Sequence, residues 1–358
     1  MVETRKAIFI HSPGSGRSDE LDNALNMLQE AGIEIVEKAA IDELDDKDRL
    51  AQHWIEAGAT ITIAAGGDGL VSGVTGMIAG HELALGIMPL GTANDVARSI
   101  DMPLDLKEAA EVIAHGPVRQ LDLGVMLPVE ATSSLASDEL LKQGKLFAHA
   151  LTMGFHAHFS TLATDKELRE QFGKLTYPVA IMEAVKNYQP TEIELRFDGL
   201  LIRERPDAQP KQMEQSVTLR CKAAQVTIAN ANVFWGALEA TLPGENSLRD
   251  GMLDVVVMED ARLDQLLVRI TRFFSRTEHT FVDHDDEWHA RYPELLRAEL
   301  TDIPGMHHLK ARGVQVRTRD GSYDVALDGE VCAKTPLGVR VLPRALPVIV
   351  PEQKREQA

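Results

Sequence analysis

The stretch 61-ITIAAGGDGLVSGVTG-76 decides the class of fold. An apolar run ends abruptly in Gly66, Gly67, Asp68 and Gly69, and a helical pattern follows at 70–80. A buried strand that leads through glycines into a helix is typical of parallel sheets. The fold does not by itself require a charged residue between the glycines, so Asp68 points to a ligand.

The same alternation extends over the first 125 residues. Strands are predicted at 6–10, 33–37, 60–65 and 84–90, and helices at 21–28, 42–58, 70–80 and from 93 onward. Strands that alternate with helices at this interval predict a parallel sheet covered on both faces. We therefore predict an α/β domain over residues 1–125.

The pattern changes after residue 125. Short β-branched and apolar runs recur with little helix between them, at 191–197, 225–234, 253–258, 314–318, 323–330 and 339–343. They predict a β-rich, antiparallel, sandwich-like domain over 126–344, and a tail of about 345–358 that packs back onto the α/β domain. Polar stretches at 129–145, 203–216 and 259–300 are interpreted as loops or insertions, the last with helical segments.

Composition limits the classes of function. The chain carries 37 Lys and Arg against 55 Asp and Glu, a net charge of −18, which argues against nucleic-acid binding and against general adhesion to anionic lipid. Its two cysteines, Cys221 and Cys332, form no CxxC pair and indicate a reduced compartment. No window approaches 18 apolar residues, so we predict a cytoplasmic protein that contacts a membrane only peripherally.

Three glycine turns follow predicted strands, at 11–16 (HSPGSG), 66–69 (GGDG) and 90–95 (LGTAND). Backbone N–H groups in such turns converge on phosphates, and ligands of parallel sheets lie beyond the carboxyl ends of the strands. Three turns at one edge therefore indicate a polyphosphate ligand. The strings GxxxxGK[ST] and GxGxxG do not occur at these turns, which excludes a P-loop enzyme and an ordinary Rossmann dehydrogenase.

These motifs resemble those of a known family, and in the same order. HSPGSG resembles NPxSG, GGDGL resembles GGDGT, and PLGTANDVARSI resembles PxGTxNDxAR. Farther along, FAHALTMGFHA, LRDGMLDVVV and ALDGE resemble the family's F-N-x-x-x-x-G-F-x-A, DGxLDVV and LDGE segments. The chain thus resembles, nearly end to end, the diacylglycerol kinase catalytic-domain family, bacterial-type lipid kinases related to sphingosine and ceramide kinases and distantly to NAD kinase.

The resemblance implies that the two domains face each other across a cleft, with ATP on the glycine turns and a lipid hydroxyl as acceptor. By position it assigns nucleotide binding to Pro13, Gly14, Ser15, Gly66, Gly67, Asp68, Gly69, Gly91, Thr92, Asn94 and Asp95. An aspartate about 4 Å from a phosphate charge is repelled by roughly 1–4 kcal/mol unless it holds a cation or a nucleotide hydroxyl. Asp68 is therefore interpreted as the anchor of ATP–Mg²⁺, and the alternative is a cap of the helix that follows it.

Two carboxylates, Asp328 and Glu330, occur in the LDGE-like motif. On a strand they would point the same way, although Gly329 could bend it. Neighbouring carboxylates raise each other's proton affinity, which suits a general base for a hydroxyl. The resemblance assigns the catalytic base to this motif without deciding between the two residues. The alternative is a plain hairpin with an Asp-Gly turn.

A third motif, ENSLRDGML at 245–253, resembles the family's structural Mg²⁺ loop. The resemblance implies a carboxylate ligand from Asp250 and backbone carbonyl ligands from Ser247 and Met252. Ligation by oxygen alone suits Mg²⁺. The alternative is an ordinary turn.

Two departures from the family affect the site. Leu70 replaces a threonine and so removes a hydroxyl beside the phosphates, for which Thr75 is a weak substitute. His149 stands where the family usually has asparagine. These changes leave the fold unaffected and leave the acceptor open.

We therefore expect an ATP- and Mg²⁺-dependent kinase that phosphorylates a hydroxyl of a diacylglycerol-like lipid at a membrane surface. One alternative is an enzyme like NAD kinase, which shares GGDG, although the chain lacks that family's Asn-x-Gly-x-Leu-Gly-Phe pattern. The other is a nucleotide-binding regulatory protein that has lost catalysis, which Leu70 suggests. The identity of the acceptor lipid and the oligomeric state stay open.

Overall fold

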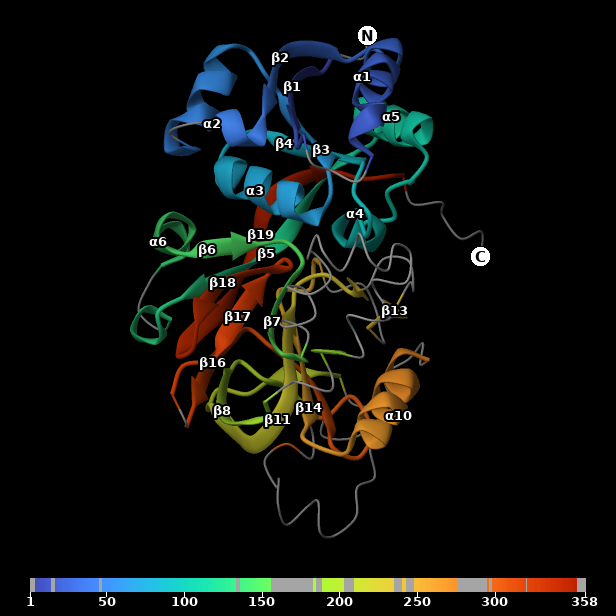
Figure 1. Cartoon of the computed structure of the whole chain (residues 1–358). Helices are drawn as coiled ribbons and strands as arrows, with labels where there is room; N and C mark the ends of the chain where they lie inside the picture. Colours follow the sequence, from blue (N-terminus) through green and yellow to red (C-terminus); the bar gives the residue numbers. More distant parts are fainter. Residues whose placement is uncertain are drawn as a thin grey trace.

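The amino-terminal part of the chain is an α/β domain (Figure 1). The computed structural model describes residues 4–13, 17–44, 47–132, 136–155, 183–184, 189–202, 209–234, 240–242, 248–275, 295, 298–319 and 321–352. The first strands are β1 (Lys6–His11), β2 (Glu34–Ala40), β3 (Ile61–Gly66) and β4 (Ala84–Pro89). They pair in parallel in the order β2–β1–β3–β4, and β3 and β4 are buried along their whole length. The predicted parallel sheet is confirmed.

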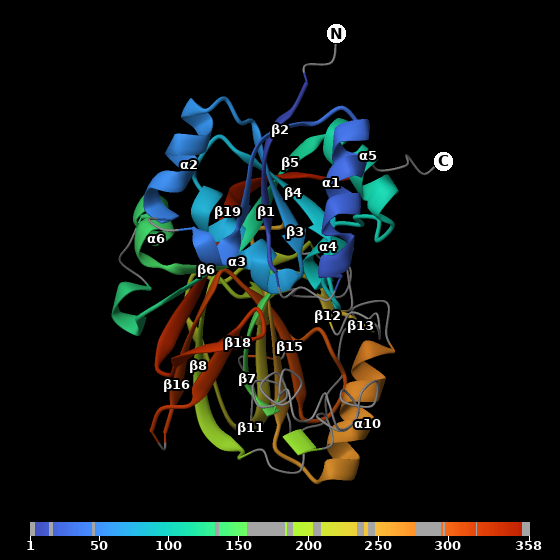
Figure 2. The same ribbon diagram turned by 45° about the horizontal axis from the view of Figure 1, so that its top comes forward.

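Helices cover both faces of this sheet. They are α1 (Leu21–Glu30), α2 (Lys47–Glu56), α3 (Asp68–Ile78), α4 (Asp95–Ser99) and α5 (Leu106–His115). Helices α1 and α5 lie together on one face, and α2 and α3 lie on the other (Figures 1 and 2). Short 3₁₀ turns occur at Ser18–Glu20, Ile41–Glu43 and Val129–Ala131.

The second part of the chain is rich in β-strands, as predicted. Its described strands are β6 (Lys145–Phe147), β7 (Ala150–Gly154), β8 (Thr191–Asp198), β9 (Leu201–Ile202), β10 (Lys211–Gln212), β11 (Val217–Ala229), β12 (Val233–Phe234), β13 (Ala240–Thr241), β14 (Leu253–Glu259), β15 (Met306–Ala311), β16 (Gly313–Thr318), β17 (Asp324–Leu327) and β18 (Glu330–Lys334). The antiparallel order is β18–β17–β7–β11–β8–β16, and β14 and β15 branch from β11.

Two strands belong to both parts of the molecule, namely β5 (Val118–Leu127) and β19 (Leu337–Ile349). They pair with each other in antiparallel fashion on both sides of an irregularity between Leu342 and Leu346. At one end β19 pairs with β16, and at the other end it runs parallel to β4 through Val348 and Leu85. The sheet is therefore continuous from the α/β domain into the β-rich domain.

The polar stretches contain more regular structure than expected. Helix α6 (Ser137–Gln143) lies within 129–145, strand β6 begins at the last residue of that stretch, and β10 lies within 203–216. The loop interpretation was wrong there, because α6 buries Leu140 completely and is held by packing. The helix expected within 259–300 is α10 (Leu263–Phe274), which buries Leu266 and Phe273.

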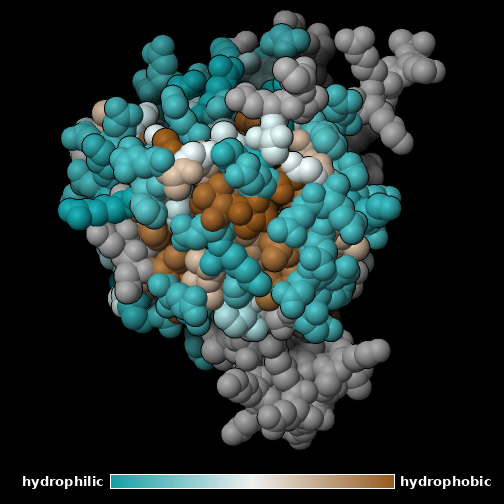
Figure 3. All heavy atoms as spheres, turned by 90° about the horizontal axis from the view of Figure 1, so that it is seen from above, coloured by the Kyte–Doolittle hydropathy of each residue, from teal (hydrophilic) through white to brown (hydrophobic). Residues whose placement is uncertain are grey.

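One face of the molecule can be followed in a space-filling view. Seen from above, the α/β domain has an apolar centre ringed by hydrophilic residues (Figure 3). Among the residues that the structure describes, no helix is both long enough and apolar enough to cross a bilayer.

Candidate active site

The second and third glycine turns lie against each other at the carboxyl ends of β3 and β4. A Cβ atom on Gly91 would lie 2.3 Å from the Cα atom of Gly67, so the close approach of the two backbones requires glycine. The Leu90 N–H also donates to the Gly66 carbonyl over 3.2 Å. Two turns that are far apart in the sequence therefore form one surface of backbone groups.

Asp68 links these two turns. Its Oδ1 atom accepts a hydrogen bond of 2.9 Å from the N–H of Val96, in the first turn of α4. Helix α3 begins at Asp68 itself, and its N-cap residue, Gly67, has no side-chain capping bond. Asp68 thus caps the neighbouring helix rather than its own, which corrects the alternative role expected from the sequence. The role of Asp68 as an ATP–Mg²⁺ anchor stays a prediction.

The second turn is closed by Asn94. Its φ is 54°, in the left-handed region that asparagine tolerates, and its side chain exchanges hydrogen bonds of 3.0 and 2.9 Å with the backbone of Gly91. Asn94 is buried, so its amide shapes the turn.

The remaining residues predicted to bind nucleotide differ in exposure. Pro13, Gly69 and Thr92 are exposed at the turns. Gly14 and Ser15 lie outside the described residues. Just beyond them, the Arg17 N–H donates to the Leu90 carbonyl over 3.0 Å, so Arg17 lies beside the start of the third turn.

Asp328 is the first residue of the two-residue turn between β17 and β18. Asp328 and Gly329 have φ angles of 47° and 91°, which is the combination that tight hairpins favour. The expectation that Asp328 and Glu330 share a strand face was therefore wrong, because Leu327 pairs with Glu330 across the hairpin and Asp328 lies outside the ladder. The two interpretations of this motif, an Asp-Gly hairpin turn and a site with a candidate base, therefore apply to the same residues.

Only one carboxylate oxygen of Asp328 accepts backbone hydrogen bonds from the described residues. Its Oδ1 atom accepts backbone N–H bonds from His149 (3.2 Å) and Ala150 (2.8 Å). The Oδ2 atom is buried and makes no hydrogen bond of normal geometry with the described residues, although the Ser72 hydroxyl is close enough to act on this carboxylate. Burial raises the pKa of Asp328, and the Asp68 carboxylate raises it further, against the opposing effects of His149, the Ser72 hydroxyl and the Ala150 N–H. A buried oxygen of this kind is a candidate proton acceptor.

Glu330 lies on the nucleotide side of the hairpin. Its side chain is exposed, and a Cβ atom on Gly69 would lie 3.7 Å from Glu330 Oε1. The LDGE-like motif of the β-rich domain therefore meets the GGDG turn of the α/β domain. The two carboxylates are not equivalent, since half-buried Asp328 is bonded to the backbone of β7 and exposed Glu330 faces the turn.

His149 connects the two domains behind Asp328. Its Nε2 atom lies 2.9 Å from the Val233 carbonyl oxygen and 3.8 Å from Asp95 Oδ2. Asp95 is buried beside this histidine and faces the β-rich domain. Sequence reasoning noted His149 only as a departure from the family.

Sequence reasoning did not identify Ser72, whose hydroxyl lowers the pKa of Asp328. It lies four residues after Asp68 on α3, and helical spacing places both residues on the face that meets the β-rich domain. That spacing is a signal that could have identified Ser72.

Leu70 does not line the site. It is buried in the core of the α/β domain, where a Cβ atom on Gly66 would meet its Cδ2 atom at 2.6 Å. Thr75 is fully buried, and its Oγ1 atom has no partner among the described residues. Thr75 therefore does not replace the missing hydroxyl, contrary to that suggestion.

The predicted Mg²⁺ loop contains an ion pair. Asp250 Oδ2 lies 2.6 Å from Lys310 Nζ, and Asp250 Oδ1 accepts the N–H of Met252 over 2.9 Å. Lys310 also lies 3.6 Å from Asp254, and these carboxylates raise the pKa of Lys310 although burial opposes them. Ser247 lies outside the described residues, and the described ones contain no cluster of three His, Cys, Asp or Glu side chains that could hold a metal. Lys310 thus brings one positive charge to Asp250 Oδ2, where Mg²⁺ would bring two, and with that oxygen engaged the described residues of this loop do not fit a further cation.

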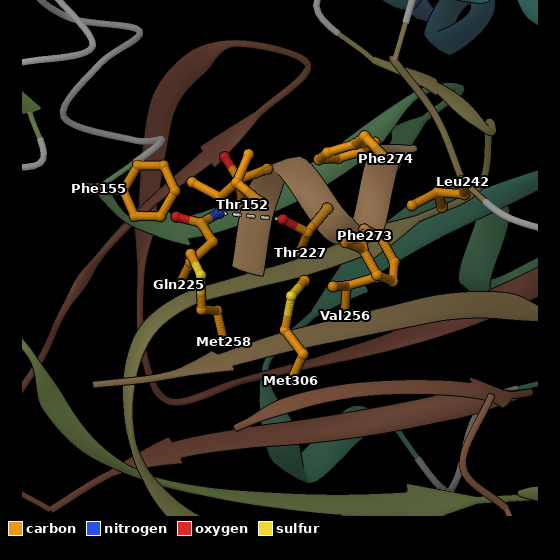
Figure 4. Close-up of a pocket in the computed structure, with 11 residues that line it drawn as sticks. Thr152, Phe155, Gln225, Thr227, Leu242, Val256, Met258, Phe273, Phe274 and Met306 are labelled. Atoms are coloured by element: carbon orange, nitrogen blue, oxygen red, sulfur yellow. Dashed lines mark hydrogen bonds between the residues drawn. The ribbon is translucent and has the colours of Figure 1, made fainter. Parts of the chain in front are cut away.

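A small apolar hollow of about 50 Å³ lies in the β-rich domain, with Thr152 of β7 in its lining (Figure 4). Leu242, Val256, Phe273, Phe274 and Met306 form its apolar wall, and Thr152, Gln225 and Thr227 lie together at one side. Gln225 Nε2 donates to Thr227 Oγ1 over 3.1 Å. Thr152 lies on β7, two residues from Ala150, the backbone donor to Asp328. Strand β7 therefore joins the hollow to the candidate base.

Comparison with known proteins agrees with this arrangement. Residues 6–126 match the family model described as "Diacylglycerol kinase catalytic domain", and residues 150–291 match "YegS C-terminal NAD kinase beta sandwich-like domain". A diacylglycerol kinase of Bacillus subtilis is 27% identical over 99% of both chains. A diacylglycerol kinase of Mycobacterium tuberculosis is 23% identical over 98% of this chain and 96% of its own.

Solved structures show the same fold. Two chains from Bacillus anthracis, one described as a diacylglycerol kinase, superpose with TM-scores of 0.65 and 0.61 at 20% and 17% identity. Each alignment covers 98% of this chain and 99% of the other. At this identity the likeness concerns the fold alone.

Proposed function

Because this chain belongs to the diacylglycerol kinase catalytic-domain family, we propose that it transfers the terminal phosphoryl group of ATP to a hydroxyl of a diacylglycerol-like lipid. The observation that carries this proposal is Asp328. Its buried Oδ2 atom makes no hydrogen bond of normal geometry with the described residues, and the Asp68 carboxylate is near enough to raise its pKa. A candidate base therefore lies opposite a candidate nucleotide site.

On the nucleotide side, the joined turns at Gly67 and Gly91 offer backbone N–H groups to phosphates. Asp68 uses Oδ1 to hold α4, which leaves its second oxygen for a cation or a nucleotide hydroxyl. These residues fit ATP–Mg²⁺. When bound, the nucleotide supplies the phosphoryl group, and the magnesium ion neutralises phosphate charge.

On the acceptor side, the lipid hydroxyl gives its proton to Asp328 Oδ2. The hydroxyl oxygen forms a bond to the terminal phosphorus while the bond from that phosphorus to the ADP oxygen breaks, so that phospholipid and ADP result. The two N–H groups on Oδ1 keep the carboxylate oriented throughout. The raised pKa makes Asp328 a stronger base than an ordinary aspartate.

The apolar hollow supports a lipid acceptor. An acyl chain gains free energy by leaving water, and the lining side chains provide an apolar surface for it. Thr152, Gln225 and Thr227 could bind ester or hydroxyl oxygens near the head of the lipid. Such a substrate resides in a membrane, so we infer peripheral membrane contact.

An acceptor panel tests the proposal. Purified protein is incubated with γ-labelled ATP, Mg²⁺ and mixed micelles that contain diacylglycerol, phosphatidylglycerol, a sphingoid base or a ceramide, and separately with NAD⁺. Mass spectrometry identifies the product. We expect label in one lipid and none in NAD⁺. Label in NAD⁺ alone, or ATP binding without transfer to any acceptor, contradicts the proposal.

A further inference from the structure

A second hollow lies on the strands that the two domains share. It has a volume of about 330 Å³, within the range of small-molecule sites, about 300–1,000 Å³. Its lining residues are Val118, Arg119, Gln120, Arg249 and Arg344. They come from the start of β5, the turn before β14 and the irregularity in β19. None of them belongs to the candidate active site.

The charge of this hollow is opposite to that of the whole chain. Three arginines and no carboxylate line it, although the chain has a net charge of −18. All three arginines are exposed. Within the described residues the structure records no ion pair for the guanidinium group of Arg119, Arg249 or Arg344. Cations that line one hollow repel one another, so an anion bound among them is stabilised.

A buried carboxylate fixes the positions of two of these arginines. Asp122 is 1% exposed, and its Oδ1 and Oδ2 atoms accept the N–H groups of Arg344 (2.8 Å) and Gly251 (2.7 Å). Burial raises the pKa of Asp122, while Arg344 and Arg249 act in the opposite direction. One side chain thus holds both the turn that carries Arg249 and the backbone of Arg344.

The backbone of Arg344 is strained at this point. Its φ is 54°, a left-handed conformation that costs a residue other than glycine of the order of 1 kcal/mol. Nothing in the strand pairing requires arginine there, because β5 and β19 pair on both sides of the irregularity. Backbone strain of this kind clusters at active sites and ligand-binding positions.

We propose that Arg119, Arg249 and Arg344 form a binding site for a phosphate-bearing anion. Guanidinium groups present N–H donors in a planar fork that matches phosphate oxygens, and three of them suit a phosphomonoester dianion. The anion is a soluble phosphate compound or the headgroup of an anionic lipid. It would join β5, β19 and the turn before β14, and so brace the strands that connect the domains.

Binding of inorganic phosphate tests the site directly. Titration is done at low salt, where ionic contacts are least screened, with the glycine turns filled by a non-hydrolysable ATP analogue. The test variant combines Arg249→Gln with Arg344→Asn, since asparagine tolerates the positive φ of position 344. The control combines Arg220→Gln with Arg262→Gln, which removes two exposed arginines elsewhere.

We expect wild type and control to bind phosphate alike and to gain thermal stability from it. The test variant should bind phosphate at least about tenfold more weakly, because it lacks two charge-assisted contacts. A second arm measures sedimentation with phosphatidylcholine vesicles, with and without phosphatidate. If the test variant binds inorganic phosphate more weakly, the ligand is a soluble phosphate compound. If only its sedimentation with phosphatidate vesicles is reduced, the ligand is a lipid headgroup.

The proposal is overturned if the test variant matches wild type and control in both arms. None of these measurements uses the kinase reaction. A failure of the proposed function therefore leaves the result of this experiment intact.

Discussion

Asp328 and Asp122 are two carboxylates with a buried oxygen and backbone hydrogen bonds, and they differ in one respect. Asp122 uses both oxygens, one for Arg344 and one for Gly251. Asp328 uses one oxygen for two N–H groups, and its other oxygen makes no hydrogen bond of normal geometry with the described residues. A carboxylate whose two oxygens both accept hydrogen bonds stabilises the fold. A carboxylate with one buried oxygen that accepts none binds a proton or a hydrogen-bond donor more readily.

The Asp250 loop belongs to the first kind. Lys310 and the Met252 N–H occupy the oxygens of Asp250, and Lys310 also lies 3.6 Å from Asp254. Substitution of Asp328 should therefore lower turnover, whereas loss of the contacts of Asp122 or Asp250 should lower the free energy of unfolding.

The largest effect is expected from Asp328→Asn. The amide oxygen can still accept the N–H groups of His149 and Ala150, so the fold and ATP affinity should change little. Loss of a general base typically lowers kcat by about 10²–10⁴. Single-turnover kinetics and calorimetry measure the two quantities. Glu330→Gln is the matched comparison, and near-normal turnover in both variants would place the base elsewhere.

Lys310→Met should act on stability instead. Lys310 is buried but the Asp250 side chain is 34% exposed, so the loss of Lys310 should cost about 1–3 kcal/mol, below the roughly 3–5 kcal/mol typical of a fully buried pair. Urea unfolding measures the loss. Lys334→Met removes an exposed pair with Asp324 and should cost about 0–1 kcal/mol. EDTA should leave the wild-type unfolding midpoint unchanged, and a clear drop would support a Mg²⁺ ion in the loop.

Asp122→Ala tests whether a carboxylate with two engaged oxygens contributes to stability rather than to turnover. It leaves the N–H groups of Arg344 and Gly251 without their acceptor, at about 1–3 kcal/mol for each that stays buried. Turnover per folded molecule should stay near normal. A variant that unfolds at the wild-type urea concentration but loses activity would reverse the roles assigned to Asp122 and Asp328.

Asp68→Asn should weaken nucleotide binding with less effect on the fold. Asparagine can still accept the Val96 N–H, while the charge that would hold a cation or a hydroxyl is lost. A charged hydrogen bond is worth about 1.5–3 kcal/mol, or about a ten- to hundredfold loss in ATP affinity by calorimetry. Asp22→Asn, at an exposed position in α1, is the control. Unchanged ATP affinity would mean that Asp68 serves only as a cap of α4.

The smallest effect concerns pH. Because the pKa of Asp328 is raised, kcat/KM should fall on acidification at a higher pH than for an ordinary aspartate, about 3.9. A raised carboxyl pKa means that the folded state binds the proton more tightly, so this stabilisation exists at acid pH and is lost as pH rises through the folded pKa. Asp328→Asn should therefore gain stability relative to wild type as pH rises. A constant difference in Tm across pH would contradict the raised pKa.

Much of the α/β domain could be predicted from the sequence, because its signals are local. The apolar runs that became β3 and β4 and the helical spacing of α1 depend on residues a few positions apart. The glycine turns are equally local, since only glycine permits the approach of Gly67 to Gly91. The motif order then predicted the family and the edge of the sheet at which the site lies.

Only the tertiary structure decided what each carboxylate does. His149 meets Asp328 across 179 positions of sequence, Arg344 meets Asp122 across 222, and Lys310 meets Asp250 across 60. Sequence periodicity places a residue on a face but does not name its partner, because the partner is set by strand pairing between distant segments. The sequence alone therefore determined the fold class and the candidate residues. The tertiary structure decided that both oxygens of Asp122 and of Asp250 have partners, whereas Asp328 keeps one oxygen without a hydrogen bond among the described residues. The reason is that the hydrogen bonds of a carboxylate depend on which N–H groups and cations the packing brings within about 3 Å.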